Sequence, residues 1–155
     1  MQNNDQANLS DRDEYIAFCV RDEEYCIGIK SVREIRRWTS ATRLPHAPGY
    51  VIGVINLRGS VLPVIDFASR LGLGKTEATE RHTIIIIEAS DQTIGLLVDT
   101  VSDILTVGEE NLQPTPAIAS EAVHEIVTGL VVMEERMLRA VNVGNIAPRI
   151  ELSAA

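Results

Sequence analysis

Short runs of alternating apolar and polar residues, separated by polar or glycine-containing turns, recur along the whole chain and predict β-strands. Residues 15–20 (YIAFCV) and 24–29 (EYCIGI) flank a polar turn at Asp22 and Glu23, which predicts an antiparallel hairpin. A turn centred there collects the large apolar side chains on one face through three cross-strand pairs. These pairs are Val20 with Tyr25, Phe18 with Ile27, and Ile16 with Ile29.

The remaining chain predicts about eight more strands and no long helix. They are expected over 32–38, 50–57, 60–66, 83–88, 93–99, 101–107, 125–132 and 136–143. Arg58 and Gly59 form the turn of the second hairpin, and Pro63 places its strand at a sheet edge or a bulge. Short helical turns are expected at 67–72 and within 108–125. About ten strands are too many for one small barrel, which favours an all-β fold of two small barrels packed together.

The expected hairpin register also sets Cys19 opposite Cys26, on the face away from the large apolar residues. A cross-strand disulfide is conceivable there. The N-terminus has no signal segment, and no apolar run reaches membrane-spanning length, so a cytosolic location and two reduced thiols are favoured.

Charge and composition indicate an ordinary globular domain with polar ends. The chain has 155 residues, with 14 basic and 22 acidic side chains and a net charge of −8, which argues against general nucleic-acid binding. A local cluster of Arg33, Arg36, Arg37 and Arg43 is either solvated strand charge or a contact patch for a partner. Residues 1–13 and 148–155 are expected to be tails around a domain at 14–147.

The candidate chemical sites are weak. The loop Gly72–Thr76 lacks a glycine five residues before Gly74 and a following helix, so it does not predict a phosphate-binding loop. The three histidines, His46, His82 and His124, are too dispersed for a metal site, and Asp99 with Asp103 has the pattern of solvated strand-end carboxylates. No enzyme activity and no cofactor are therefore expected, and a binding role is favoured.

Several motifs occur in an order that resembles the CheW family, the coupling proteins of bacterial chemotaxis. They are SVREIRR from Ser31, GVINLRGSVLPVIDF from Gly53, GLLVDTVSDIL from Gly95 and TGLVVMEERMLRAVNV from Thr128. The resemblance covers residues 14–146. It implies two five-stranded barrels side by side, with a further hydrophobic core between them. It also implies a non-catalytic adaptor that links chemoreceptors to the chemotaxis histidine kinase, in the cytoplasm at receptor arrays beneath the membrane. A related twitching-motility or other receptor–kinase pathway is the alternative.

The resemblance also implies two sets of site residues. The chemoreceptor tip would contact Ile29, Val32, Glu34, Ile35, Arg58 and Ile104. For the isoleucines the alternative is ordinary core packing, and for Glu34 with Arg58 it is a local ion pair. The regulatory domain of the kinase would contact Thr42, Gln113, Ala117 and Ile118, of which the last three depart from the residue types of the family. The resemblance gives no role to Trp38, which is either core or an anchor for a partner.

Overall fold

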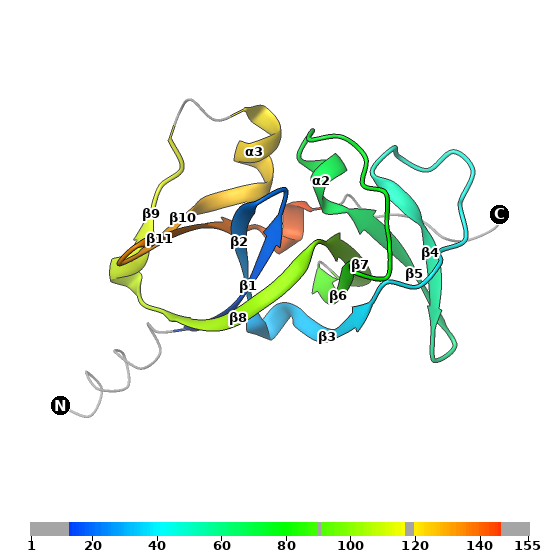
Figure 1. The fold of residues 1–155 in the computed structure, drawn as a ribbon, viewed down its shortest axis with the longest axis horizontal. Helices are drawn as coiled ribbons and strands as arrows, with labels where there is room; N and C mark the ends of the chain where they lie inside the picture. The colour runs from blue at the N-terminus through cyan, green and yellow to red at the C-terminus, as the bar shows by residue number, and fades with distance from the viewer. Residues whose placement is uncertain (1–12, 90, 117–119, 147–155) are drawn as a thin grey trace.

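A computed structural model describes residues 13–89, 91–116 and 120–146 of the chain (Figure 1). The strands are β1 (Asp13–Val20), β2 (Glu23–Gly28), β3 (Val32–Arg37), β4 (Val51–Leu57), β5 (Ser60–Asp66), β6 (Thr83–Ala89), β7 (Gln92–Val98), β8 (Thr100–Val107), β9 (Leu112–Gln113), β10 (Val127–Met133) and β11 (Arg136–Val141). The short helices are η1 (Ile29–Ser31), α2 (Phe67–Arg70), η2 (Glu109–Asn111), α3 (Glu121–Ile126) and η3 (Val143–Asn145). Apart from Asp13, which begins β1, the predicted tails at 1–13 and 148–155 lie outside the described residues.

The strands form two sheets that pack against each other, which confirms the all-β prediction. Sheet A has the order β8-β1-β2-β11-β10-β9, and sheet B has the order β3-β6-β7-β5-β4. The two predicted five-stranded barrels correspond to a six-stranded and a five-stranded sheet, which are barrel-like but not closed, because no strand pairing within the described residues joins the two ends of either sheet.

Sheet A is built from two separate pieces of the chain. The chain passes from sheet A to sheet B through η1, between β2 and β3, and returns at Asp99, between β7 and β8. Sheet B is therefore a continuous piece of the chain, whereas sheet A combines strands from both ends. The parallel pairing of β11 with β2, at Arg139 with Tyr25 and Ala140 with Cys26, joins the two pieces of sheet A.

Three hydrophobic cores hold this arrangement together. The inter-sheet core contains Phe18, Phe67 and Ile85, all fully buried, together with side chains from both sheets, α2, α3 and η3. A second core lies within sheet A and a third within sheet B, each built from strands of one sheet only. These side chains are buried without cover from the strands of the other sheet, which requires each sheet to curl around its own core. Trp38 packs against the sheet B core, which supports its core interpretation.

The first hairpin has a different register from the predicted one. Phe18 lies opposite Tyr25, and Cys19 lies opposite Glu24 rather than Cys26. The turn is shorter than predicted because Arg21 and Asp22 both take positive φ, 52° and 67°, as a two-residue turn requires. The shift is two residues, so the apolar side chains remain on the predicted face. Both cysteines are free thiols.

Two other local predictions also differ from the structure. β5 lies between β7 and β4, so Pro63 is not in an edge strand, but pairing with β7 covers only Val64–Asp66 and does not require a proline N–H. β10 begins at Val127 rather than at 125, because α3 continues through Ile126. Ser120 caps α3 by accepting a hydrogen bond from the backbone N–H of Val123, which makes helix the stable local structure there.

Candidate partner-binding surface

A β-bulge in β3 determines which way the candidate side chains of that strand face. Val32 lies opposite Ile87, but Glu34 already lies opposite Ile86, so Arg33 is an extra residue. Simple alternation predicts Val32 and Ile35 on opposite faces. The bulge instead puts both on the face of Ile85 and Ile87, toward sheet A. The two apolar residues of β3 therefore share one face, whereas simple alternation places them on opposite faces.

Strand β3 lies at one edge of sheet B and strand β8 at one edge of sheet A. Each of them carries an exposed isoleucine on the face that points toward the other sheet. Ile35 of β3 lies opposite the buried Ile85 and is 45% exposed. Ile104 of β8 lies opposite the buried Ile16 and is 57% exposed. Figure 1 draws β8, η1 and β3 along the same lower side of the molecule. We call Ile29, Val32, Ile35 and Ile104 the apolar edge; Ile29 and Val32 pack partly against the inter-sheet core.

Glu34 and Arg58 meet on the other face of β3. Arg58 is at the tip of the β4–β5 hairpin with φ 52°, next to Gly59 with φ 88°, as predicted for this turn. The backbone N–H of Gly59 donates to Asn56 Oδ1 at 2.9 Å, which fixes the turn. Arg58 Nη2 then donates to Glu34 Oε1. That bond, together with one from Arg36 Nη1 at 3.1 Å, lowers the pKa of Glu34.

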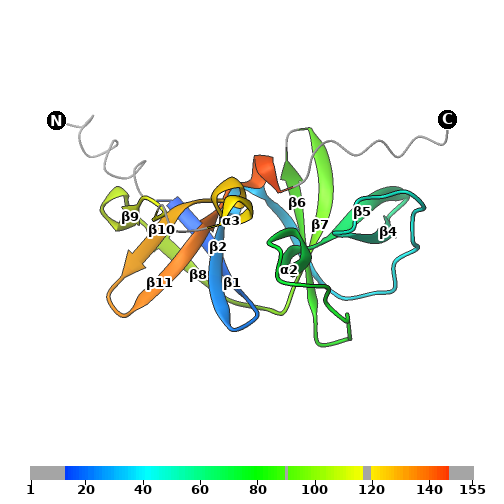
Figure 2. The ribbon, with the colours of Figure 1, turned by 90° about the horizontal axis from the view of Figure 1, so that it is seen from above.

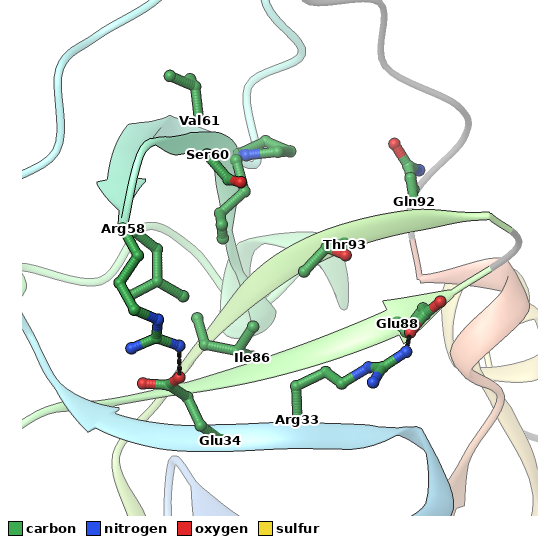
Figure 3. A pocket seen from close by; sticks show the side chains of 12 residues that line it. Arg33, Glu34, Arg58, Ser60, Val61, Ile86, Glu88, Gln92 and Thr93 are labelled. Carbon is green, nitrogen blue, oxygen red and sulfur yellow. Dashed lines mark hydrogen bonds and ion pairs between the residues drawn. The ribbon is translucent and has the colours of Figure 1, made fainter.

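An open groove with an apolar floor and charged rims runs between β3 and the β4–β5 hairpin. Figure 3 shows Arg33 and Glu34 pointing to the same side of β3, as the two residues of a bulge do, with Ile86 between β3 and the hairpin that carries Arg58. Arg33 pairs with Glu88 at one rim and Arg58 with Glu34 at the other. The floor is formed by Leu57, Leu62 and Ile86. We call this the β3 groove.

The six predicted receptor residues thus fall into two neighbouring groups. Glu34 and Arg58 form a rim of the β3 groove, and the other four form the apolar edge. Strand β3 belongs to both, because adjacent residues Glu34 and Ile35 point to its two faces. The local ion pair proposed as an alternative for Glu34 and Arg58 is present. Core packing accounts for part of the side chains of Ile29 and Val32, but Ile35 and Ile104 are exposed.

The two predicted kinase-contact residues that the structure describes, Thr42 and Gln113, lie at opposite ends of the molecule. Thr42 bonds to Val54 through both backbone groups, at 2.9 and 2.7 Å, beside the outer strand of sheet B. Gln113 is exposed in β9, the outer strand of sheet A, at the other end of the molecule (Figure 1). Ala117 and Ile118 lie outside the described residues.

The weak chemical candidates have structural roles. Thr76 donates its backbone N–H and its hydroxyl to the buried Asp66, at 2.7 and 2.8 Å, so this loop is tied to a carboxylate. Asp99 accepts the backbone N–H of Arg21 at 2.9 Å, whereas Asp103 pairs with Arg136. Within the described ranges, no three His, Cys, Asp or Glu side chains are arranged to hold a metal ion.

Sequence reasoning missed some exposed residues that belong to the surface. Val61, beside the hairpin tip, is 54% exposed and lines the β3 groove. Val61 and Leu62 are adjacent in a strand, so their side chains point to opposite faces and one of the two had to face outward. The sequence therefore indicated that one of these two residues is exposed. Arg70 and Arg136 also connect segments that are distant in the sequence, but no local pattern marks them, because their partners are 33 to 112 residues away.

Comparisons with known proteins agree with this architecture. The model of the CheW-like domain family matches residues 14–151. The chain is 51% identical over 142 residues to a Chemotaxis protein CheW of Rhizobium meliloti (strain 1021), covering 92% of each chain. It is 35% identical to a Chemotaxis protein CheW of Bacillus subtilis (strain 168), covering 88% of this chain and 87% of the relative.

A solved structure supports the same fold. The crystal structure of scaffolding protein TtCheW from Thermoanaerobacter tengcongensis superposes with a TM-score of 0.80 at 30% identity. The match covers 86% of this chain and 91% of that one. In the part of the chain that the structure describes, every helix is too short or too polar to cross a bilayer.

Proposed function

The chain belongs to the CheW-like domain family, a family of non-catalytic chemotaxis scaffolds, and from this premise we propose that it couples chemoreceptors to the chemotaxis histidine kinase. It would bind the cytoplasmic tip of a receptor and the regulatory domain of the kinase. Its place in the cell would then be the cytoplasm, at receptor arrays on the inner face of the membrane. The chain is not an enzyme.

The observation that carries the receptor proposal is the two-sided chemistry of β3. One face of this edge strand presents the exposed Ile35, and the other presents Glu34 paired with Arg58. Strand β8, drawn along the same lower side of the molecule in Figure 1, presents the exposed Ile104. An amphipathic helix offers an apolar stripe flanked by polar residues, which suits isoleucine contacts with a nearby carboxylate and guanidinium. The rigid sheets hold these groups in place before the partner arrives, which lowers the entropic cost of binding.

The kinase contact is proposed for the outer ends of the two sheets. Thr42 and Gln113 lie at opposite ends, so one compact partner would not cover both. Two separate contacts would instead let one adaptor touch two neighbours. Because Gln113, Ala117 and Ile118 depart from the residue types of the family, the contact at the end of sheet A is the less supported of the two.

The proposal is tested by calorimetry with the purified chain. The partners are a chemoreceptor cytoplasmic signalling fragment and the kinase regulatory domain, each titrated separately. We expect micromolar binding to both, and kinase autophosphorylation that depends on receptor only when the chain is present. If neither partner binds, the adaptor proposal is wrong. If both bind but kinase activity is unchanged in a chemotaxis system, a different receptor–kinase pathway is indicated.

A further inference from the structure

Arg70, the last residue of α2, contacts two backbone carbonyls, one carboxylate and one aromatic ring. Its Nε donates to the carbonyl of Ile146 at 2.5 Å, and its Nη2 donates to the carbonyl of Asn145 at 3.1 Å. The same Nη2 lies 3.2 Å from Glu125 Oε1, and the guanidinium stacks 5.1 Å from the ring centroid of Tyr50. The side chain is only 12% exposed.

These contacts join the two sheets. α2 directly follows β5 of sheet B, whereas η3 follows β11 and α3 precedes β10, both of sheet A. The sheet A side is itself braced, because Asn145 Nδ2 donates to the Glu125 carbonyl at 3.0 Å. A planar guanidinium can donate to two carbonyls and a carboxylate at once while stacking on a ring, which an ammonium cannot do.

Arg70 lies on the opposite side of the inter-sheet core from β3 and β8, so its contacts can affect how far apart these two strands are. Figure 1 shows α2 and α3 on the upper side of the molecule, with β3 and β8 on the lower side. Figure 2, seen from above, agrees, because α2 and α3 lie in front of β3 and β8. The inter-sheet core lies between these two sides. A tilt of one sheet against the other at the upper side therefore changes the separation of the lower edges.

We propose that Arg70 is a latch that sets the relative orientation of the two sheets, and thereby the spacing between β3 and β8 along the apolar edge. It is a positioning residue, because it lies away from that edge and acts through the packing of the sheets. Its effect on receptor affinity rests on the proposed function, but its effect on the spacing does not.

Arg139 provides a matched control within one sheet. Its Nη2 pairs with Glu23 at 2.7 Å, and its guanidinium stacks 5.5 Å from the ring centroid of Tyr25. It therefore has the same kinds of partner as Arg70, an acid and a tyrosine ring, but all of them belong to sheet A. Loss of Arg139 removes similar interactions without releasing one sheet from the other.

The spacing is measured by double electron–electron resonance between spin labels on the two edge strands. The labels are placed at Arg37→Cys in β3 and Thr106→Cys in β8, two exposed positions, in a Cys19→Ser background. Cys26 is fully buried, and burial raises its pKa to about 12, so it would stay unlabelled. The variants compared are Arg70→Ala, Arg70→Lys and Arg139→Ala, and receptor-fragment affinity is measured for each without labels.

We expect Arg70→Ala and Arg70→Lys to broaden or displace the distance distribution, with Arg139→Ala close to the parent. Receptor affinity should fall about fivefold or more for the Arg70 variants alone.

Unchanged distances in folded Arg70 variants would overturn the latch, as would equal distance changes in Arg139→Ala. Altered distances with unchanged affinity would overturn its link to the receptor. If Arg70→Ala does not fold, Arg70→Lys decides. If the parent chain binds no receptor, the proposed function fails, and the distances alone decide the latch.

Discussion

Arg58 and Glu34, 24 residues apart in the sequence, form an ion pair across the rim of the β3 groove. The Arg58 side chain is 70% exposed, so it is available to a partner, and such an exposed pair contributes little to folding stability. The pair keeps Arg58 above the groove rather than free in solvent. This arrangement separates the effects of Arg58 on binding from its effects on stability.

Replacement of Arg58 by alanine is expected to weaken receptor binding about tenfold and leave thermal unfolding almost unchanged. The reason is that the guanidinium is exposed and its ion-pair partner, Glu34, keeps a second bond from Arg36. Calorimetry with the receptor fragment and a thermal melt measure the two effects. A large loss of stability with normal binding would show that Arg58 is structural.

The carboxyl of Glu34 should titrate below its ordinary pKa of 4.5, because of the hydrogen bond from Arg58 and then that from Arg36. A lowered folded-state pKa means that the pair stabilises the fold fully above the ordinary pKa, and that this contribution disappears as the pH falls through the lowered value. NMR of the side-chain carboxyl carbon follows the titration. Arg58→Ala should move the midpoint up toward 4.5, and an unmoved midpoint would contradict the pair in solution.

Ile35→Ser and Ile104→Ser should each reduce receptor affinity about tenfold without unfolding the chain, since about half of each side chain is already exposed to water. Met137→Ser is the matched control, because Met137 is 58% exposed on β11, away from both edge strands. The measurement is again calorimetry with the receptor fragment. If Met137→Ser weakens binding as much as the isoleucine variants do, the apolar edge is not a specific contact.

Ellman's reagent at pH 8 should modify one thiol of the native chain and two in denaturant. Burial raises the pKa of Cys26 to about 12, so almost no thiolate forms there, whereas Cys19 is only partly buried. Cys19→Ser should then abolish the native reaction. Rapid modification of two thiols in the folded chain would contradict the packing of Cys26 within sheet A.

Asp66→Ala should destabilise the chain by about 1–3 kcal/mol, because it leaves the Thr76 N–H and hydroxyl without their acceptor and removes the cap of α2. Thr76→Val should cost less, about 1 kcal/mol, since the backbone bond survives. Urea denaturation measures both. Equal losses in the two variants would show that neither the backbone bond from Thr76 nor the cap of α2 contributes to stability.

Most of the strands and the position of the β4–β5 turn could be predicted from the sequence, because both depend on local patterns. Strands follow from the alternation of apolar and polar residues, and the turn follows from a glycine, which takes positive φ in the structure. The sequence could not place the bulge at Arg33, since an extra residue is visible only against the partner strand β6. The first hairpin register failed for a similar reason. A shift by two preserves the apolar face, so the pattern fits both registers and only the geometry at Arg21 and Asp22 selects one.

The candidate surface was predictable only in part. The motifs around Glu34 and Arg58 pointed to two residues that the structure brings together, but the division of the candidate residues between two faces of β3 depends on the bulge. Arg70 had no sequence signal, because its carbonyl partners lie 75 and 76 residues later and are recognised only after both sheets are packed.

Because sheet A combines strands from both ends of the chain, its assembly is tied to the completion of synthesis. On the ribosome, β1 and β2 emerge first but must wait for β8 and β11, their flanking strands. Sheet B, continuous from Val32 to Val98, has all its strands available much earlier. A nascent chain that stops before β11 would leave β2 with an open edge, so premature termination should yield a product prone to aggregation and proteolysis rather than a half-active adaptor.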